Sequence, residues 1–149
     1  MTFGSPENER KLYRKNLVEK SALIWLVLIG AEIIHGILRA IVLVPLVGEF
    51  RSNQIGVFTG AAIIVAIVYL TIRWIGAAQR SEQLAVGASW LVVTVAFEVL
   101  FGRFVVGLSW ERIGSDYDLL NGGLMPVGLL VLLFSPMVAS KLRRVRESS

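Results

Sequence analysis

Four long apolar segments dominate the chain, and short polar segments separate them. An α-helix needs about 20 mainly apolar residues to cross the hydrocarbon core of a bilayer. The first three segments reach that length, and the fourth, which contains Pro126 and Pro136, is the shortest. The pattern predicts an all-α, polytopic membrane protein with four transmembrane helices arranged as two hairpins. The predicted spans are 22–47, 55–74, 84–108 and 121–139.

The polar residues 1–20 come before the first span and are expected to form a cytoplasmic N-terminal segment. Ser5 followed by Pro6 and Glu7 is typical of a helix start, with Ser5 as the N-cap. Leu12, Tyr13 and nearby basic residues predict a short interfacial helix lying on the headgroup layer. The following apolar segment is too long for a cleaved signal peptide, so we expect an uncleaved first span.

Basic residues are concentrated in three of the polar segments, which gives the chain an expected orientation. Positive charge favours the cytoplasmic side of a bacterial inner membrane. The N-terminal segment, the connection between spans two and three, and the tail 141–149 carry most of it. The rule therefore places both termini in the cytoplasm and the connections 48–54 and 109–121 outside. The basic residues counted are Arg10, Lys11, Arg14, Lys15, Lys20, Arg73, Arg80, Lys141, Arg143, Arg144 and Arg146.

Composition limits the chemistry further. Hydrophobic residues make up 55% of the chain and charged residues 17%, and the net charge of +4 reads as membrane orientation, not as a nucleic-acid surface. The absence of cysteine excludes disulfides, thiolate metal sites and covalent haem attachment. With one histidine, His35, a two-histidine haem site or a zinc site would need two copies of the chain. We therefore predict no cofactor and no metal, and membrane lipids as the surroundings.

Charged residues inside the predicted spans are the strongest functional signal. A charged side chain at mid-bilayer costs roughly 2.5–3.5 kcal/mol on insertion scales, so such residues usually face protein or water. At about 100° per residue, Glu32, His35 and Arg39 share one face of span one. We expect Glu98 to pair with Arg39 or His35 across an interface between spans one and three. The alternative is a structural set that fixes helix register. The intramembrane cluster is Glu32, His35, Arg39, Glu98 and Arg103.

A short internal repeat links spans one and three. Residues 31–36 and 97–102 both read Glu, two aliphatic residues, an aromatic ring and Gly, and an Arg follows each. The repeat predicts two similar hairpins related by a pseudo-twofold axis along the membrane normal. Small residues spaced four apart also predict close helix packing within the chain or in a homo-oligomer. These pairs are Gly36/Ala40, Gly56/Gly60, Ala62/Ala66 and Ser135/Ala139.

The connection 109–121 is acidic, with Glu111, Asp116, Asp118 and Asn121. An Asp-x-Asp with a nearby Glu and Asn could bind calcium, but no calcium-loop pattern is complete. A solvated acidic loop, with residues 115–118 capping a short interfacial helix that ends at Gly122, is the better interpretation.

Three functions are consistent with these features. The sequence contains no phosphate loop, dinucleotide fingerprint, zinc-protease motif or nucleophile elbow, which disfavours an enzyme. We favour a transport or channel-like protein that uses the intramembrane cluster, because four balanced ionisable groups exceed what helix register needs. The second hypothesis is a structural or accessory protein that binds a larger membrane complex or lipids. The third is a membrane enzyme acting on a lipid, with Glu98 or His35 as acid and base.

Overall fold

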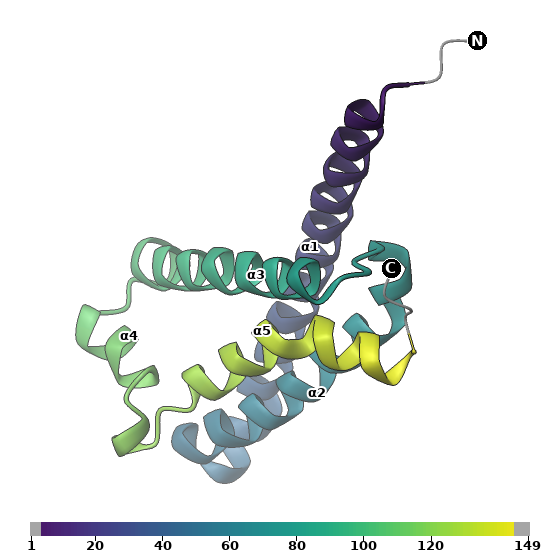
Figure 1. Cartoon of the computed structure of the whole chain (residues 1–149). Coiled ribbons are helices and arrows are strands. Elements are labelled where there is room, and N and C mark those ends of the chain that lie inside the picture. Colours follow the sequence, from purple (N-terminus) through teal and green to yellow (C-terminus); the bar gives the residue numbers. More distant parts are fainter. Residues whose placement is uncertain (1–3, 145–149) are drawn as a thin grey trace.

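The computed structural model describes residues 4–144 and contains four helices long and apolar enough to cross a membrane. The long helices are α1 (Pro6–Val47), α2 (Glu49–Ile75), α3 (Arg80–Leu100) and α5 (Met125–Leu142). A π-helix, η1 (Phe101–Val106), extends α3. The short helix α4 (Trp110–Asp116) and the 3₁₀ turn η2 (Leu119–Asn121) connect it to α5 (Figure 1). The prediction of an all-α polytopic membrane protein is confirmed.

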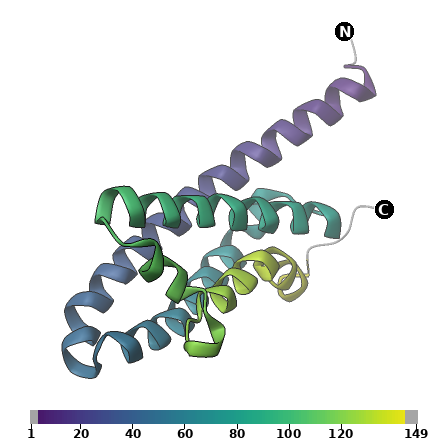
Figure 2. The ribbon, with the colours of Figure 1, turned by 90° about the vertical axis from the view of Figure 1, so that its left-hand side faces the viewer.

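Three boundaries differ from the predicted ones. The N-terminal segment does not form a separate interfacial helix: α1 runs through it without a break for 42 residues, and its first turns stand clear of the other helices (Figures 1 and 2). From Tyr13 onward α1 contacts the rest of the bundle, because the Tyr13 hydroxyl donates to the Gly76 carbonyl oxygen at 2.9 Å. Residues 7–21 contain no Gly or Pro, so no helix-breaking residue separates the N-terminal segment from the first span. Ser5 is the N-cap residue, as predicted. Residues 1–3 and 145–149, which hold part of the predicted tail, lie outside the described range.

The first connection is also shorter than expected. Gly48 alone, at φ +83°, turns the chain from α1 into α2, where a connection over 48–54 was predicted. That backbone conformation favours glycine, because a side chain there is strained. Residues 49–54 contain no helix breaker, and Glu49 in the first turn suits the positive end of the helix dipole. Helix α5 begins later than the predicted span, at Met125.

The helices pack in the order α1, α2, α5, α3. The row closes where α3 crosses α1: the Trp90 indole donates to the Ser21 carbonyl oxygen at 2.9 Å, and the Trp25 indole donates to Thr94 Oγ1 at 2.9 Å. An apolar core that includes Ile24, Val68 and Leu132 fills the bundle at this level. Beyond the crossing, towards the end where α4 lies, α1 and α3 diverge (Figures 1 and 2).

Helices α3 and α5 approach each other closely at Gly87 of α3, a residue outside the small-residue pairs predicted from the sequence. A methyl group there would lie 1.9 Å from the Leu133 carbonyl oxygen of α5. The contact holds α3 against α5 and so fixes the wall of the bundle that carries Glu98.

Replacing Gly87 by Ala should therefore destabilise the protein by about 3 kcal/mol, the upper range for overpacking a close contact. Thermal unfolding in detergent measures the change. Gly30→Ala is the matched control, because a methyl group at Gly30 has no neighbour within 4 Å. Equal unfolding temperatures for the two variants would contradict the assigned packing of α3 on α5.

Candidate functional site

The charged residues of α1 lie against a glycine surface on α2. A methyl group at Gly60 would lie 2.8 Å from Glu32 Oε2, and one at Gly56 would lie 2.5 Å from Arg39 Cδ. Both glycines are buried. The Gly56/Gly60 pair thus does more than let two backbones approach: it leaves room for two charged side chains between the helices.

His35 has both ring nitrogens engaged. Its Nε2 lies 2.7 Å from Thr59 Oγ1, and its Nδ1 lies 3.3 Å from Glu32 Oε2. The Thr59 hydroxyl donates within its own helix, to the carbonyl oxygen of Ile55 or Gly56, so its oxygen is left to accept from Nε2–H. Nδ1 and the Glu32 carboxyl group therefore form a pair between side chains of the same helix.

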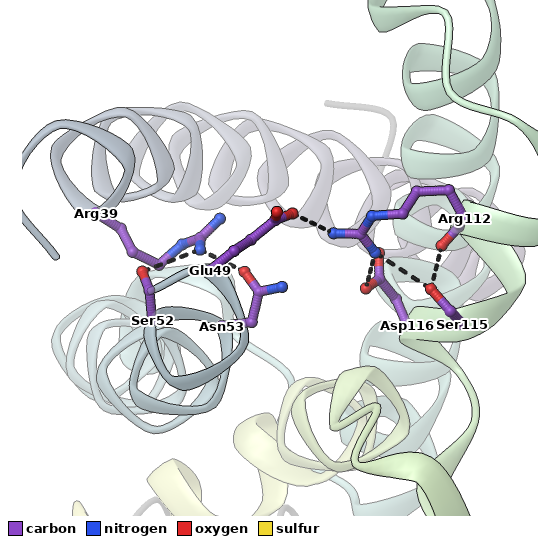
Figure 3. A network of polar contacts seen from close by, with 7 residues as sticks. All are labelled: Arg39, Glu49, Ser52, Asn53, Arg112, Ser115 and Asp116. Carbon is purple, nitrogen blue, oxygen red and sulfur yellow. Dashed lines mark hydrogen bonds and ion pairs between the residues drawn. The ribbon is translucent and has the colours of Figure 1, made fainter. Parts of the chain in front are cut away.

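Arg39 turns to the first turns of α2. Its guanidinium donates to Ser52 Oγ at 3.2 Å and to Asn53 Oδ1 (Figure 3). Both acceptors are neutral, so Arg39 has no carboxylate partner among the described residues. The expected pairing of Glu98 with Arg39 or His35 is therefore wrong. The reason is the divergence of α1 and α3, which leaves the α1 side chains closer to α2.

Glu98 makes no hydrogen bond or ion pair to any residue between 4 and 144. It lines the wall of a cavity of about 880 Å³, the main cavity, which lies between the four long helices on the α4 side of their crossing. Ligand sites in proteins typically have volumes of about 300–1,000 Å³. The floor is apolar, with Leu28, Ile64 and Leu132, and these side chains also belong to the core or pack against it.

The cluster predicted from the sequence is thus only partly assembled. Glu32, His35, Arg39 and Glu98 all line the main cavity. Arg103 does not: it donates to the Leu108 carbonyl oxygen at 3.2 Å and lies over the Trp110 ring, 5.5 Å from its centre. Around an α-helix, Arg103 lies about 140° from Glu98. The two side chains therefore leave the continuous α3–η1 helix on different faces.

Residues 107–123, the α4 segment, border the main cavity at one end. Arg112 ties this segment to α2: its guanidinium lies 2.7 Å from Glu49 Oε1 and 2.7 Å from Asp116 Oδ1 (Figure 3). Hydrogen bonds to Asp116 and then to Glu49 raise the pKa of Arg112, so it stays charged. Asp118 accepts from the Leu120 N–H, and the turn ends at Gly122, as predicted. Within residues 4–144, no three acidic or histidine side chains meet as metal ligands.

Three contributors to the site were missed by sequence reasoning. Thr59 is a polar residue on the same stretch of α2 as Gly56 and Gly60, and that combination was a usable signal. Arg112 belongs to the connection between spans three and four, where periodicity does not indicate which way a side chain points. Tyr117, in the same connection, lines a smaller cavity beside Glu98 and was missed for the same reason.

Comparison with known proteins gives one informative similarity. The chain is 27% identical over 126 residues to "Heme A synthase" of Bartonella henselae, covering 76% of this chain and 34% of that protein. The chain therefore spans about a third of its relative's length. No protein-family model matches the chain, and no solved structure matches it.

This similarity corrects the functional prediction. Transport was favoured from the intramembrane charges, whereas the relative is a membrane enzyme. The structure gives a physical reason for the correction: Glu32 and His35 are paired with each other, and apolar core residues form the floor of the main cavity. The charges thus line a cavity whose floor is apolar.

The bond between His35 and Thr59 provides a test of this arrangement. Thr59→Val leaves the Nε2–H of a largely buried imidazole without an acceptor, so stability should fall by about 1 kcal/mol. Thr71→Val is the control, since the Thr71 hydroxyl bonds only carbonyl oxygens of its own helix. Thermal unfolding of both variants measures the difference, and equal stabilities would show that the His35–Thr59 bond does not form.

Proposed function

We propose that the protein is a membrane enzyme that binds an amphipathic substrate in the main cavity and that Glu98 exchanges a proton with it. The observation that carries the proposal is the free Glu98 carboxyl group in the cavity wall. An ionisable residue within a span is expensive, and one that has no structural partner is a functional candidate by default. The similarity to a membrane enzyme supports the same reading.

Glu98 is a better acid–base candidate than the other cavity groups. Glu32 lies against the surface of Gly60, and its Oε2 already has His35 as a partner. His35 has no free ring nitrogen. A general acid or base must reach the reacting atom of the substrate within hydrogen-bond distance, directly or through one water. Glu98 meets this requirement because its carboxyl group has no competing partner in the protein.

The main cavity also indicates the kind of substrate. An apolar body would pack on the floor formed by Leu28, Ile64 and Leu132, and an anionic edge would pair with Arg39, whose protein partners are both neutral. Guanidinium groups bind carboxylates and phosphates in this way. The relative is named for making haem A, so an iron porphyrin with its two carboxylates is the first substrate to test.

The residues fit the body and edge of a porphyrin better than its iron. His35 is the one histidine of the chain, and an iron ligand there would have to displace Thr59 from Nε2. The positive-inside rule places the α4 end on the outer side, so the substrate would enter from the outer leaflet.

Glu98→Gln should abolish turnover and leave binding intact, because the amide keeps the shape of the side chain and cannot exchange the proton. The protein in lipid nanodiscs is titrated with haem, and tryptophan quenching reports binding. Products from haem, and from a bacterial lipid extract, are then compared by mass spectrometry. Loss of a general acid or base costs roughly 10²–10⁴-fold in rate.

Glu111→Gln is the matched control, since Glu111 is an exposed residue of α4 that does not line the main cavity. It should keep both binding and product formation. Equal product formation by Glu98→Gln and the wild type would overturn the assignment of Glu98. Absence of any product that depends on the wild-type protein, from either source, would overturn the enzyme proposal.

A further inference from the structure

A second, smaller cavity shares Glu98 with the main cavity. It has a volume of about 70 Å³, and we call it the side chamber. Its polar lining groups are Glu98, Asp116 and Tyr117, and Gly102 forms part of its wall. Glu98 and Asp116 line both cavities. The side chamber therefore connects the intramembrane carboxyl group with the α4 segment.

The fold brings α4 onto this chamber through Gly102. This residue is buried in the π-helix, and a methyl group on it would lie 3.5 Å from Leu108 and 3.7 Å from Ile113. The segment after the π-helix thus folds back onto the helix that carries Glu98. Single π-turns within α-helices occur often at functional sites, because the wide turn redirects the chain there.

Tyr117 is the one polar residue of the side chamber that is not a carboxylate. Its hydroxyl is buried and has no hydrogen-bond partner among the described residues. Burial, and then the nearby carboxylates of Glu98 and Asp116, raise the pKa of Tyr117. A phenol beside two carboxylates is the natural donor, since ionised carboxylates can only accept. Buried polar groups are satisfied in most proteins, often by a water, and a cavity of this size holds one.

We propose that Tyr117 is a positioning residue for Glu98, and that its hydroxyl holds the Glu98 carboxyl group through a water in the side chamber. The link rests on the proposed role of Glu98, but it exists in the resting protein and needs no substrate. It fixes the carboxyl group at the boundary between the two cavities. It also makes the α4 segment, which is tied to α2 by Arg112, part of the machinery that orients the acid–base group.

Other charged groups share the cavity walls and must be kept constant in any test. They are Glu32, His35 and Arg39 of α1, Glu49 of α2 and Arg112, Asp116 and Asp118 of the α4 segment. The residues of α5 in this wall, Met125, Gly128, Leu129 and Leu132, carry no titratable group. A change confined to Tyr117 can therefore be read at Glu98 without altering the charge of the site.

The decisive variant is Tyr117→Phe, which removes only the hydroxyl. If that hydroxyl had no partner, removing it would leave stability unchanged or raise it, because an unsatisfied buried group disappears. If it holds Glu98, the variant loses a hydrogen bond, and the unfolding temperature falls. Tyr69→Phe is the matched control: it removes the same group from a ring on α2 that lies over Arg143.

Infrared difference spectroscopy on the full chain in nanodiscs supplies a readout that a packing role would not move. The Glu98 band is identified as the one lost in Glu98→Gln. We expect Tyr117→Phe to shift that band and Tyr69→Phe to leave it in place. The converse experiment changes Glu98 and observes Tyr117. Glu98→Gln should lower the pKa of Tyr117, because a neighbouring negative charge is removed. The absorbance of the phenolate measures this pKa.

An unshifted Glu98 band together with an unchanged or higher unfolding temperature in Tyr117→Phe would overturn the inference. Because these measurements use no substrate, they succeed or fail independently of the search for products. A shifted band with no turnover of any substrate would support the link and count against the enzyme proposal alone.

Discussion

The high cost of charged groups in an apolar environment is the constraint on which the rest of this structure depends. Helix α1 carries Glu32, His35 and Arg39 on one face, and that face must be covered by groups able to accommodate it. Helix α2 meets the requirement with two glycines, which give the side chains space, and with Thr59, Ser52 and Asn53, which accept their hydrogen bonds. The α1–α2 hairpin therefore provides partners for His35 and Arg39, whereas Glu32 Oε1 has no hydrogen-bond partner among the described residues.

His35 and Arg39 find their partners on α2 and not on α3, and the α1 and α3 helices diverge at this level. They meet through Trp25 and Trp90 and separate towards α4. The main cavity is the space that this divergence creates, and Glu98 is the charged group left without a partner in it. The binding site and the free carboxyl group thus have one physical origin.

The sequence was sufficient to predict the four helices and to single out Glu32, His35, Arg39 and Glu98, which all line the main cavity. Long apolar segments and the cost of intramembrane charge are strong signals, and neither depends on contacts distant in sequence. The Glu98 partner could not be predicted in the same way. Periodicity tells which residues share a face of a helix, but the crossing angle of α1 and α3 decides what that face meets.

Other failures have equally local causes. Arg103 leaves its helix on a different face from Glu98 and contacts Leu108 and Trp110. No composition signal marks the π-helix in residues 101–106. The turn at Gly48 needed a single residue where a polar loop was expected, because the polar residues that follow it are the partners of Arg39. The parallel repeat remains a prediction: its two acids line one cavity, but only the second motif is followed by a π-helix.

The central claim is that Glu98 is free in the main cavity whereas Glu32 is held by His35. Labelling with a hydrophobic carbodiimide, read by peptide mass spectrometry, tests it most directly, since this reagent modifies accessible carboxyl groups within membranes. The account predicts that Glu98 is modified well before Glu32 in the intact protein, and that the difference disappears after denaturation. Faster modification of Glu32, or protection of both carboxyl groups until the protein unfolds, would contradict it.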